Sequence, residues 1–204
     1  DDSLSSLIGC GQRDLLIEYI RMIRRYGFSF EYAQGMVIRD LWDNVKNEPD
    51  VELIQELYGH EVVADKFVGC YGQYTPFEFL QEENTTALNC KLLLYERELL
   101  VLRAILAAGV KYLSYSCIVG RPDDAAQQFQ LAEARMKQIQ GIIEAAGAHG
   151  RATPFVYSVF PGTRLWSQEV GTLEYPIEEY PELYQLNAAP HGTRILSCVE
   201  LMEA

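Results

Sequence analysis

Four short apolar segments recur along the chain, and each is followed or preceded by a stretch with helical periodicity. They begin near residues 28, 65, 110 and 153, at intervals of 37, 45 and 43 residues. Strands that alternate with helices at such spacing are typical of consecutive βα units, whose strands pair in parallel. The pattern predicts an α/β fold. A complete eightfold barrel takes about 250 residues, so a chain of 204 residues predicts a partial (β/α) barrel of the TIM-like type.

The helices between these strands are predicted from apolar side chains that repeat every three to four residues. The first has an apolar face made of Leu16, Tyr19, Ile20, Ile23 and Tyr26. Further helices are expected at 51–58, 95–109 and about 124–143, the last capped by Asp123 or Asp124. From about residue 173 the period is lost. We therefore expect a barrel region over 1–172 and an irregular wrapping tail with a short C-terminal helix over 173–204.

Charge and cysteine content limit the function classes. The chain has 17 basic and 29 acidic residues and a formal net charge of −12, which argues against a nucleic-acid partner. No apolar run reaches the ~18–20 residues of a membrane span, and no basic leader precedes an apolar one. Five scattered cysteines form neither a disulfide framework nor a metal knuckle, and three isolated histidines predict no metal site. These features favour a cytoplasmic protein with reduced thiols.

Residues that follow the predicted strands are the candidates for ligand binding, because ligands of parallel α/β folds bind at the carboxyl ends of the strands. Asp2 would share this rim if a strand preceded it. The other members are Gln34, Gly35, Arg39, Tyr71 to Gln73, Gly120 to Asp124, and Pro161, Gly162, Thr163 and Arg164.

Two members of the rim have both a binding and a structural interpretation. Gly120 directly follows a buried strand, so a flat ring could reach the main chain at Val119 and Gly120. The same glycine could simply make the turn into the next helix. Arg39 could bind a carboxylate through two guanidinium nitrogens, or it could form a structural ion pair with Asp40. The sequence leaves both pairs of alternatives open.

Five short segments carry a family resemblance through their order and spacing. They are Asp1-Asp2-Ser3-Leu4, Phe67-Val68-Gly69-Cys70-Tyr71, Leu88-Asn89-Cys90-Lys91, Ile118-Val119-Gly120-Arg121-Pro122 and Phe160-Pro161-Gly162-Thr163-Arg164-Leu165. Together they resemble the second half of a radical S-adenosylmethionine (radical SAM) core, especially the subgroup that often carries a cobalamin-binding domain upstream.

The resemblance implies an intact enzyme that cleaves S-adenosylmethionine with a [4Fe–4S] cluster, as an oxidoreductase, a methyltransferase or a cyclase-like enzyme. In this subgroup cobalamin is an optional further cofactor. Contacts to a small-molecule substrate would come from Asp2, Pro161, Gly162, Thr163 and Arg164. Cofactor contacts would come from Gln34, Arg39, Tyr71, Val119, Gly120 and Pro122.

The family's cluster loop, C-x-x-x-C-x-x-C, is absent from the sequence, and five scattered cysteines cannot supply three thiolates from one loop. We therefore interpret the chain as the C-terminal portion of a radical SAM core, inactive alone and binding no cofactor tightly without the N-terminal part of the same enzyme. The unclosed sheet would leave an edge for self-association. The alternative is a non-catalytic α/β ligand-binding or scaffold domain, which would explain the absent loop directly.

Overall fold

A computed structural model describes residues 5–33, 35–77, 93–120, 124–157 and 179 of the chain. Contacts between Cα atoms divide the chain into two compact units. The first contains the described parts of residues 1–78, 83–116 and 137–153, and the second contains the described parts of 117–136 and 154–204. The predicted tail over 173–204 lies outside the described residues except for Glu179.

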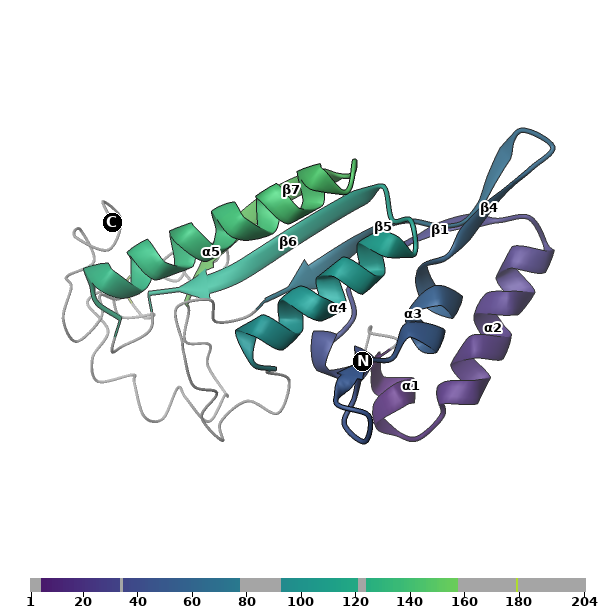
Figure 1. Cartoon of the computed structure of the whole chain (residues 1–204), viewed down its shortest axis with the longest axis horizontal. Coiled ribbons are helices and arrows are strands. Elements are labelled where there is room, and N and C mark those ends of the chain that lie inside the picture. The colour runs from purple at the N-terminus through teal and green to yellow at the C-terminus, as the bar shows by residue number, and fades with distance from the viewer. Residues whose placement is uncertain (1–4, 34, 78–92, 121–123, 158–178, 180–204) are drawn as a thin grey trace. The chain divides into compact units, whose positions relative to one another are not determined.

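Consecutive parallel strands form the main sheet, in the order β1-β5-β6-β7 (Figure 1). Register pairs make β1 parallel to β5 and β5 parallel to β6. Hydrogen bonds from His149 N to Lys111 O and from Tyr157 N to Val119 O join β7 to β6 with a constant offset, as parallel strands require. The strands are Ser29–Tyr32 (β1), Lys66–Pro76 (β5), Tyr112–Val119 (β6) and His149–Val156 (β7). The predicted α/β fold with a parallel sheet is confirmed, and the described strands do not close into a barrel.

One strand of the sheet is antiparallel, which the sequence analysis did not predict. β4 (His60–Val63) pairs with the beginning of β5, with His60 opposite Gly69 and Val63 opposite Lys66. The two turn residues between them, Ala64 and Asp65, have φ of 49° and 63°. Two consecutive positive φ angles are the geometry of a tight hairpin turn that matches the twist of its strands.

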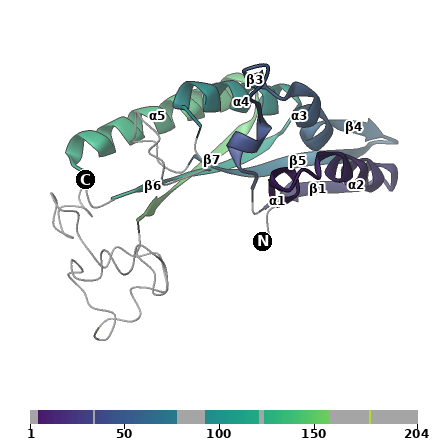
Figure 2. The ribbon, with the colours of Figure 1, turned by 90° about the horizontal axis from the view of Figure 1, so that it is seen from below.

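Four helices follow the predicted ones within a few residues: α2 (Arg13–Arg25), α3 (Val51–Tyr58), α4 (Tyr95–Ala107) and α5 (Ala126–Ala145). In the first unit, α3 and α4 lie on one side of β5 and β6, while α2 packs beside α3 (Figures 1 and 2). The predicted face of α2 needs correction. Its buried side chains are Leu16, Ile17 and Ile20, whereas Tyr19 and Tyr26 are exposed. Tyrosine can lie at the edge of an apolar stripe, because its ring packs while its hydroxyl stays in contact with water.

Smaller elements complete the first unit. They are α1 (Ser5–Gly9), the 3-10 helix η1 (Ile38–Leu41) and a short antiparallel pair, β2 (Trp42–Asp43) with β3 (Glu48–Pro49). The guanidinium carbon of Arg97 in α4 lies 5.0 Å from the ring centroid of Trp42, a cation–π contact that ties this pair to the helix.

The core lies between the sheet and the helices. β5 and β6 contribute Val68, Cys70, Leu113 and Tyr115, all at most 2 % exposed. Facing side chains from α3 and α4 are equally buried and include Leu53, Ile54, Leu57, Leu102 and Ile105. Since burial of one such side chain stabilises the fold by about 1.5–3 kcal/mol, this layer makes a large contribution to the stability of the first unit.

Two predicted strand boundaries were wrong. The rim residues Tyr71 to Gln73 were expected to follow the second strand, but β5 continues to Pro76 and includes them. Gly69 and Gly72 interrupt the alternation of apolar and polar side chains that would have predicted a longer strand. The last predicted strand began at Thr153, whereas β7 begins at His149. Among the described helices, none is both long and apolar enough to cross a membrane.

Candidate functional site

The strands β1, β5 and β6 have a face turned away from α3 and α4, which we call the distal face. In β6, Leu113 and Tyr115 are buried toward the helices, whereas Tyr112 is 55 % exposed and Ser114 is half-buried. Register pairs place Gly72 beside Tyr112 and Tyr74 beside Ser114. Because side chains alternate across a strand, these residues share the distal face.

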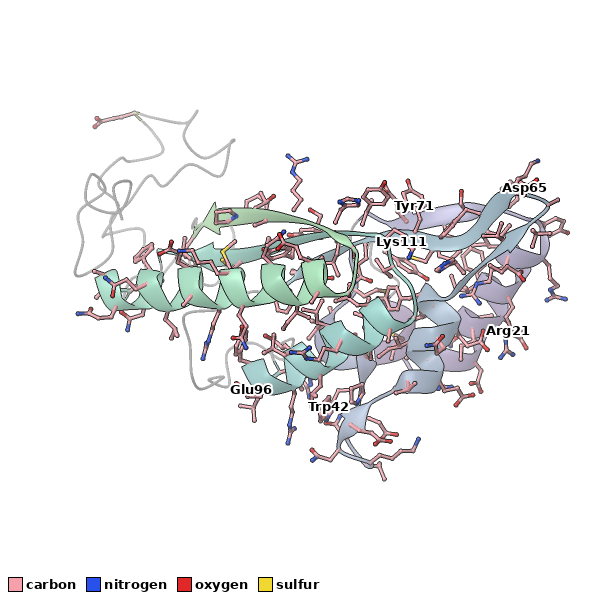
Figure 3. The ribbon with its side chains drawn as sticks, turned by 45° about the horizontal axis from the view of Figure 1, so that its top comes forward. Arg21, Trp42, Asp65, Tyr71, Glu96 and Lys111 are labelled. Atoms are coloured by element: carbon pink, nitrogen blue, oxygen red, sulfur yellow. The ribbon has the colours of Figure 1, made fainter. Side chains whose placement is uncertain are left out.

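Tyr71 also lies on this face, at a bulge in β5. The pairing of β1 with β5 runs from Phe30 opposite Cys70 to Glu31 opposite Gly72, so that Tyr71 is the additional residue. Figure 3 shows Tyr71 on the other side of the sheet from Trp42 and Glu96. A bulge re-aims a side chain at the cost of one unpaired residue, and bulges are frequent beside binding sites. Here it leaves two consecutive residues, Tyr71 and Gly72, on the same face.

The Tyr71 hydroxyl donates a hydrogen bond to the carboxylate of Glu31. This bond is the main reason why the pKa of Tyr71 lies above its ordinary value, and the negative charge of Glu31 and burial act in the same direction. Loss of the phenol proton would place two negative charges side by side. Tyr71 therefore remains a hydrogen-bond donor at neutral pH.

The distal face carries a hollow of about 260 Å³ between β1, β5 and β6. Gly72 is one of its lining residues. A Cβ at Gly72 would lie 3.6 Å from Glu31 Oε2 and 3.4 Å from Tyr112 O, so the carboxylate and the strand β6 flank the space above this glycine. The lining residues are Glu31, Tyr32, Ala33, Gly72, Gln73, Tyr74, Tyr112 and Ser114.

Aromatic rings continue from the hollow toward the amino ends of the strands. Tyr71 and Tyr112 are edge to face, with centroids 6.2 Å apart and an interplanar angle of 83°. His149 stacks on Tyr112 at 5.4 Å, and Phe67 contacts Tyr71 at 6.4 Å. At the other end of the hollow, the Tyr74 hydroxyl and Ser116 Oγ are 2.5 Å apart. The site thus combines a carboxylate, hydroxyls and several π faces.

Of the predicted cofactor-binding residues in the first unit, Tyr71 lies on the distal face and Arg39 lies in η1. Tyr71 stands in the middle of β5 and not after its carboxyl end, because the strand is longer than predicted. Arg39 is exposed. Its charge lowers the pKa of the neighbouring Asp40, but burial is the larger effect and raises that pKa. The role of Arg39 stays a prediction.

The predicted main-chain site at Val119 and Gly120 lies in the second unit. One amide and one carbonyl of this site already form hydrogen bonds within the protein. Gly120 N donates to Asp124 Oδ2 over 2.9 Å, and Val119 O accepts from Tyr157 N over 2.7 Å. Gly120 has φ of 80°, which favours glycine at this turn. At the start of α5 the side chain of Gln128 accepts from Ala125 N.

The remaining predicted contacts lie outside the described residues. They are Asp2, Gln34, Pro122, Pro161, Gly162, Thr163 and Arg164. Conversely, the sequence analysis missed Glu31, Tyr74, Tyr112 and Ser114. Alternation of polar and apolar side chains in 112–117 was a usable signal for the last two, since every second residue there is polar or small.

The described residues do not fit a [4Fe–4S] cluster. No group of three or more His, Cys, Asp or Glu side chains within the described ranges could hold a metal ion. Burial raises the pKa of Cys70 to about 12 and that of Cys117 to about 11, and a thiolate is the form that binds iron.

Comparisons with protein-family models, with curated proteins and with solved structures found no match to this chain.

Proposed function

We propose that the chain is the C-terminal part of the catalytic barrel of a radical SAM enzyme, and that its distal face supplies part of the ligand-binding surface. The strand order carries the proposal. In β1-β5-β6-β7, each parallel strand lies beside the next one in the chain, as in a barrel wall. A doubly wound sheet would instead reverse its strand order at a switch point.

The position of the hollow supports the same interpretation. In a (β/α) barrel the helices cover the outside, and residues on the opposite face of the strands point to the interior. α3 and α4 cover one face of β5 and β6, and the hollow of about 260 Å³ opens on the other. It is slightly smaller than a typical ligand pocket of roughly 300–1,000 Å³, as expected for one wall of a larger site.

Within this proposal, the chain binds and orients and does not carry the redox chemistry. Glu31, held by Tyr71, and the hydroxyls of Tyr74 and Ser114 suit the ribose hydroxyls and the cationic part of S-adenosylmethionine. The rings of Tyr71 and Tyr112 suit an adenine face. The cluster that cleaves the cofactor would be bound by another segment, since the described cysteines do not suit it.

The proposal is tested by extending the coding sequence upstream of Asp1 and comparing the longer protein with the 204-residue chain. Both are incubated anaerobically with iron and sulfide, reduced, and supplied with S-adenosylmethionine. We expect iron–sulfur absorbance and 5′-deoxyadenosine release from the longer protein only. A longer protein without cluster or cleavage would contradict the proposal and would favour a non-catalytic ligand-binding or scaffold domain.

A variant of the hollow ties this activity to the distal face. In the longer protein, Ser114→Leu should lower 5′-deoxyadenosine formation roughly tenfold or more, because small misplacements of a reactant are costly. Glu61→Gln, on the exposed outer strand β4, serves as the control and should not change the rate. Equal rates in both variants would show that the hollow does not take part.

A further inference from the structure

The hollow on the distal face combines one carboxylate with several aromatic rings, and no lysine or arginine occurs among its described lining residues. We propose that it binds an organic onium cation, meaning a quaternary ammonium or a sulfonium group. This inference rests on the proposed role of the distal face as a ligand-binding surface. It does not depend on radical chemistry.

The carboxylate of Glu31 is placed to contact a cation above Gly72. Its Oε2 atom is 3.6 Å from the position that a Cβ on Gly72 would take, so the missing side chain leaves room for a methyl-sized group next to the carboxylate. Tyr71 is a hydrogen-bonding neighbour of this carboxylate.

The tyrosine rings supply the second half of such a site. Cations bind over ring faces within about 6 Å of the centroid. Tyr74 and Tyr112 line the hollow together with Glu31, and Tyr71 packs edge to face against Tyr112 with ring centroids 6.2 Å apart. Aromatic rings beside a carboxylate are the combination by which proteins recognise methylated ammonium groups.

Other ligand classes fit this hollow less well. A phosphate or carboxylate would meet the like charge of Glu31, and the net charge of −12 would add to the repulsion at long range. A neutral apolar group would cover the Glu31 carboxylate without pairing it, which costs free energy. A weakly hydrated cation avoids both penalties.

Pairs of isosteric probes test the proposal on the full 204-residue chain. Choline is compared with 3,3-dimethyl-1-butanol, its neutral analogue, and S-adenosylmethionine with S-adenosylhomocysteine, which lacks the sulfonium charge. In NMR titrations we expect each cation to bind roughly tenfold more tightly than its neutral partner. Equal affinities within both pairs would overturn the proposal.

Two variants with matched controls localise the binding. Glu31→Gln should weaken choline binding roughly two- to fivefold, whereas Glu61→Gln makes the same charge change on β4 and should leave it unaltered. Tyr112→Leu should weaken binding by a similar factor, with the exposed Tyr26→Leu on α2 as the control. If circular dichroism shows that Tyr112→Leu is unfolded, the isosteric Glu31→Gln variant still tests the proposal. Choline affinity that is equal in Glu31→Gln and the unaltered chain would contradict the proposal.

The probe pairs also separate this inference from the proposed function. Choline binding with no S-adenosylmethionine binding would support the onium site and would agree with a chain that binds no cofactor tightly alone, so that the radical SAM interpretation depends on the test with the longer protein. Equal binding of S-adenosylmethionine and S-adenosylhomocysteine, without choline binding, would contradict the onium site and leave the radical SAM interpretation intact.

Discussion

Tyr71 illustrates how a single additional residue can build a site. Val68 and Cys70 face the helices, so alternation alone puts Tyr71 on the distal face, and the bulge opposite Phe30 and Glu31 puts Gly72 there as well. The interaction of the phenol with Glu31 raises the pKa of Tyr71. The bulge leaves Tyr71 without a ladder partner in β1.

The cysteines allow a test at the residue scale. Burial raises the pKa of Cys70 to about 12 and that of Cys117 to about 11, while Cys10 is exposed. At pH 8 the thiolate fraction of the two buried residues is then roughly one in a thousand or less. Iodoacetamide should alkylate Cys10 well before Cys70 and Cys117, as measured by peptide mass spectrometry.

Unfolding provides the control for this alkylation. In concentrated urea the three thiols should react at similar rates, because the burial that protects two of them is lost. Labelling of Cys70 in the native chain as fast as that of Cys10 would contradict the buried position. It would also reopen the question of whether this thiol can ligate iron.

The site could be predicted from the sequence only in part, for reasons that particular residues make clear. Gly120 stood out because a glycine after an apolar run marks a turn, and its φ of 80° agrees. Glu31 did not stand out, because its importance depends on the bulge in a distant strand. Tyr71 was chosen for its supposed place after a strand, and it reached the distal face by a different route.

Among the elements, α3 depends on Asp50 at its start. Asp50 Oδ1 accepts a hydrogen bond from Leu53 N over 3.0 Å and lies 3.2 Å from Arg13 Nη2. Asp50→Ala removes both contacts and should lower the free energy of unfolding by about 1 kcal/mol or somewhat more. Asp50→Asn keeps a capping oxygen and should lose only the part-exposed ion pair, worth about 0–1 kcal/mol.

Urea unfolding of these two variants separates the capping bond from the ion pair. We expect the free energy of unfolding of the asparagine variant to be closer to that of the unaltered chain than the value for the alanine variant is. If asparagine were as destabilising as alanine, then the attraction between Arg13 and Asp50 would dominate, and the cap would contribute little.

At the same scale, helices were easier to predict than strands. α3 and α4 repeat apolar residues at helical spacing, and this periodicity depends on neighbouring residues only. β5 reads Lys-Phe-Val-Gly-Cys-Tyr-Gly-Gln-Tyr-Thr-Pro. Before the bulge Val68 and Cys70 face the helices, and after it Gln73 and Thr75 do. A strand whose alternation changes phase, with two glycines nearby, gives no regular pattern.

For the whole molecule, the alternation of strands and helices was enough to predict a parallel α/β fold. The hairpin of β4 with β5 escaped because its turn, Ala64-Asp65, lacks the glycine that usually marks such turns. Self-association through a sheet edge stays a prediction. The same holds for the radical SAM interpretation, which depends on the strand order and on the resemblance of short segments.

The central claim is that the distal face of the sheet binds the ligand. Its most direct test is a map of amide chemical shifts of the full chain during titration with millimolar S-adenosylmethionine. The account predicts that the shifts concentrate at Glu31, Gly72 and Ser114. Shifts centred instead on the helix side, at Leu53 and Leu102, or no shifts at Gly72 at saturation, would contradict it.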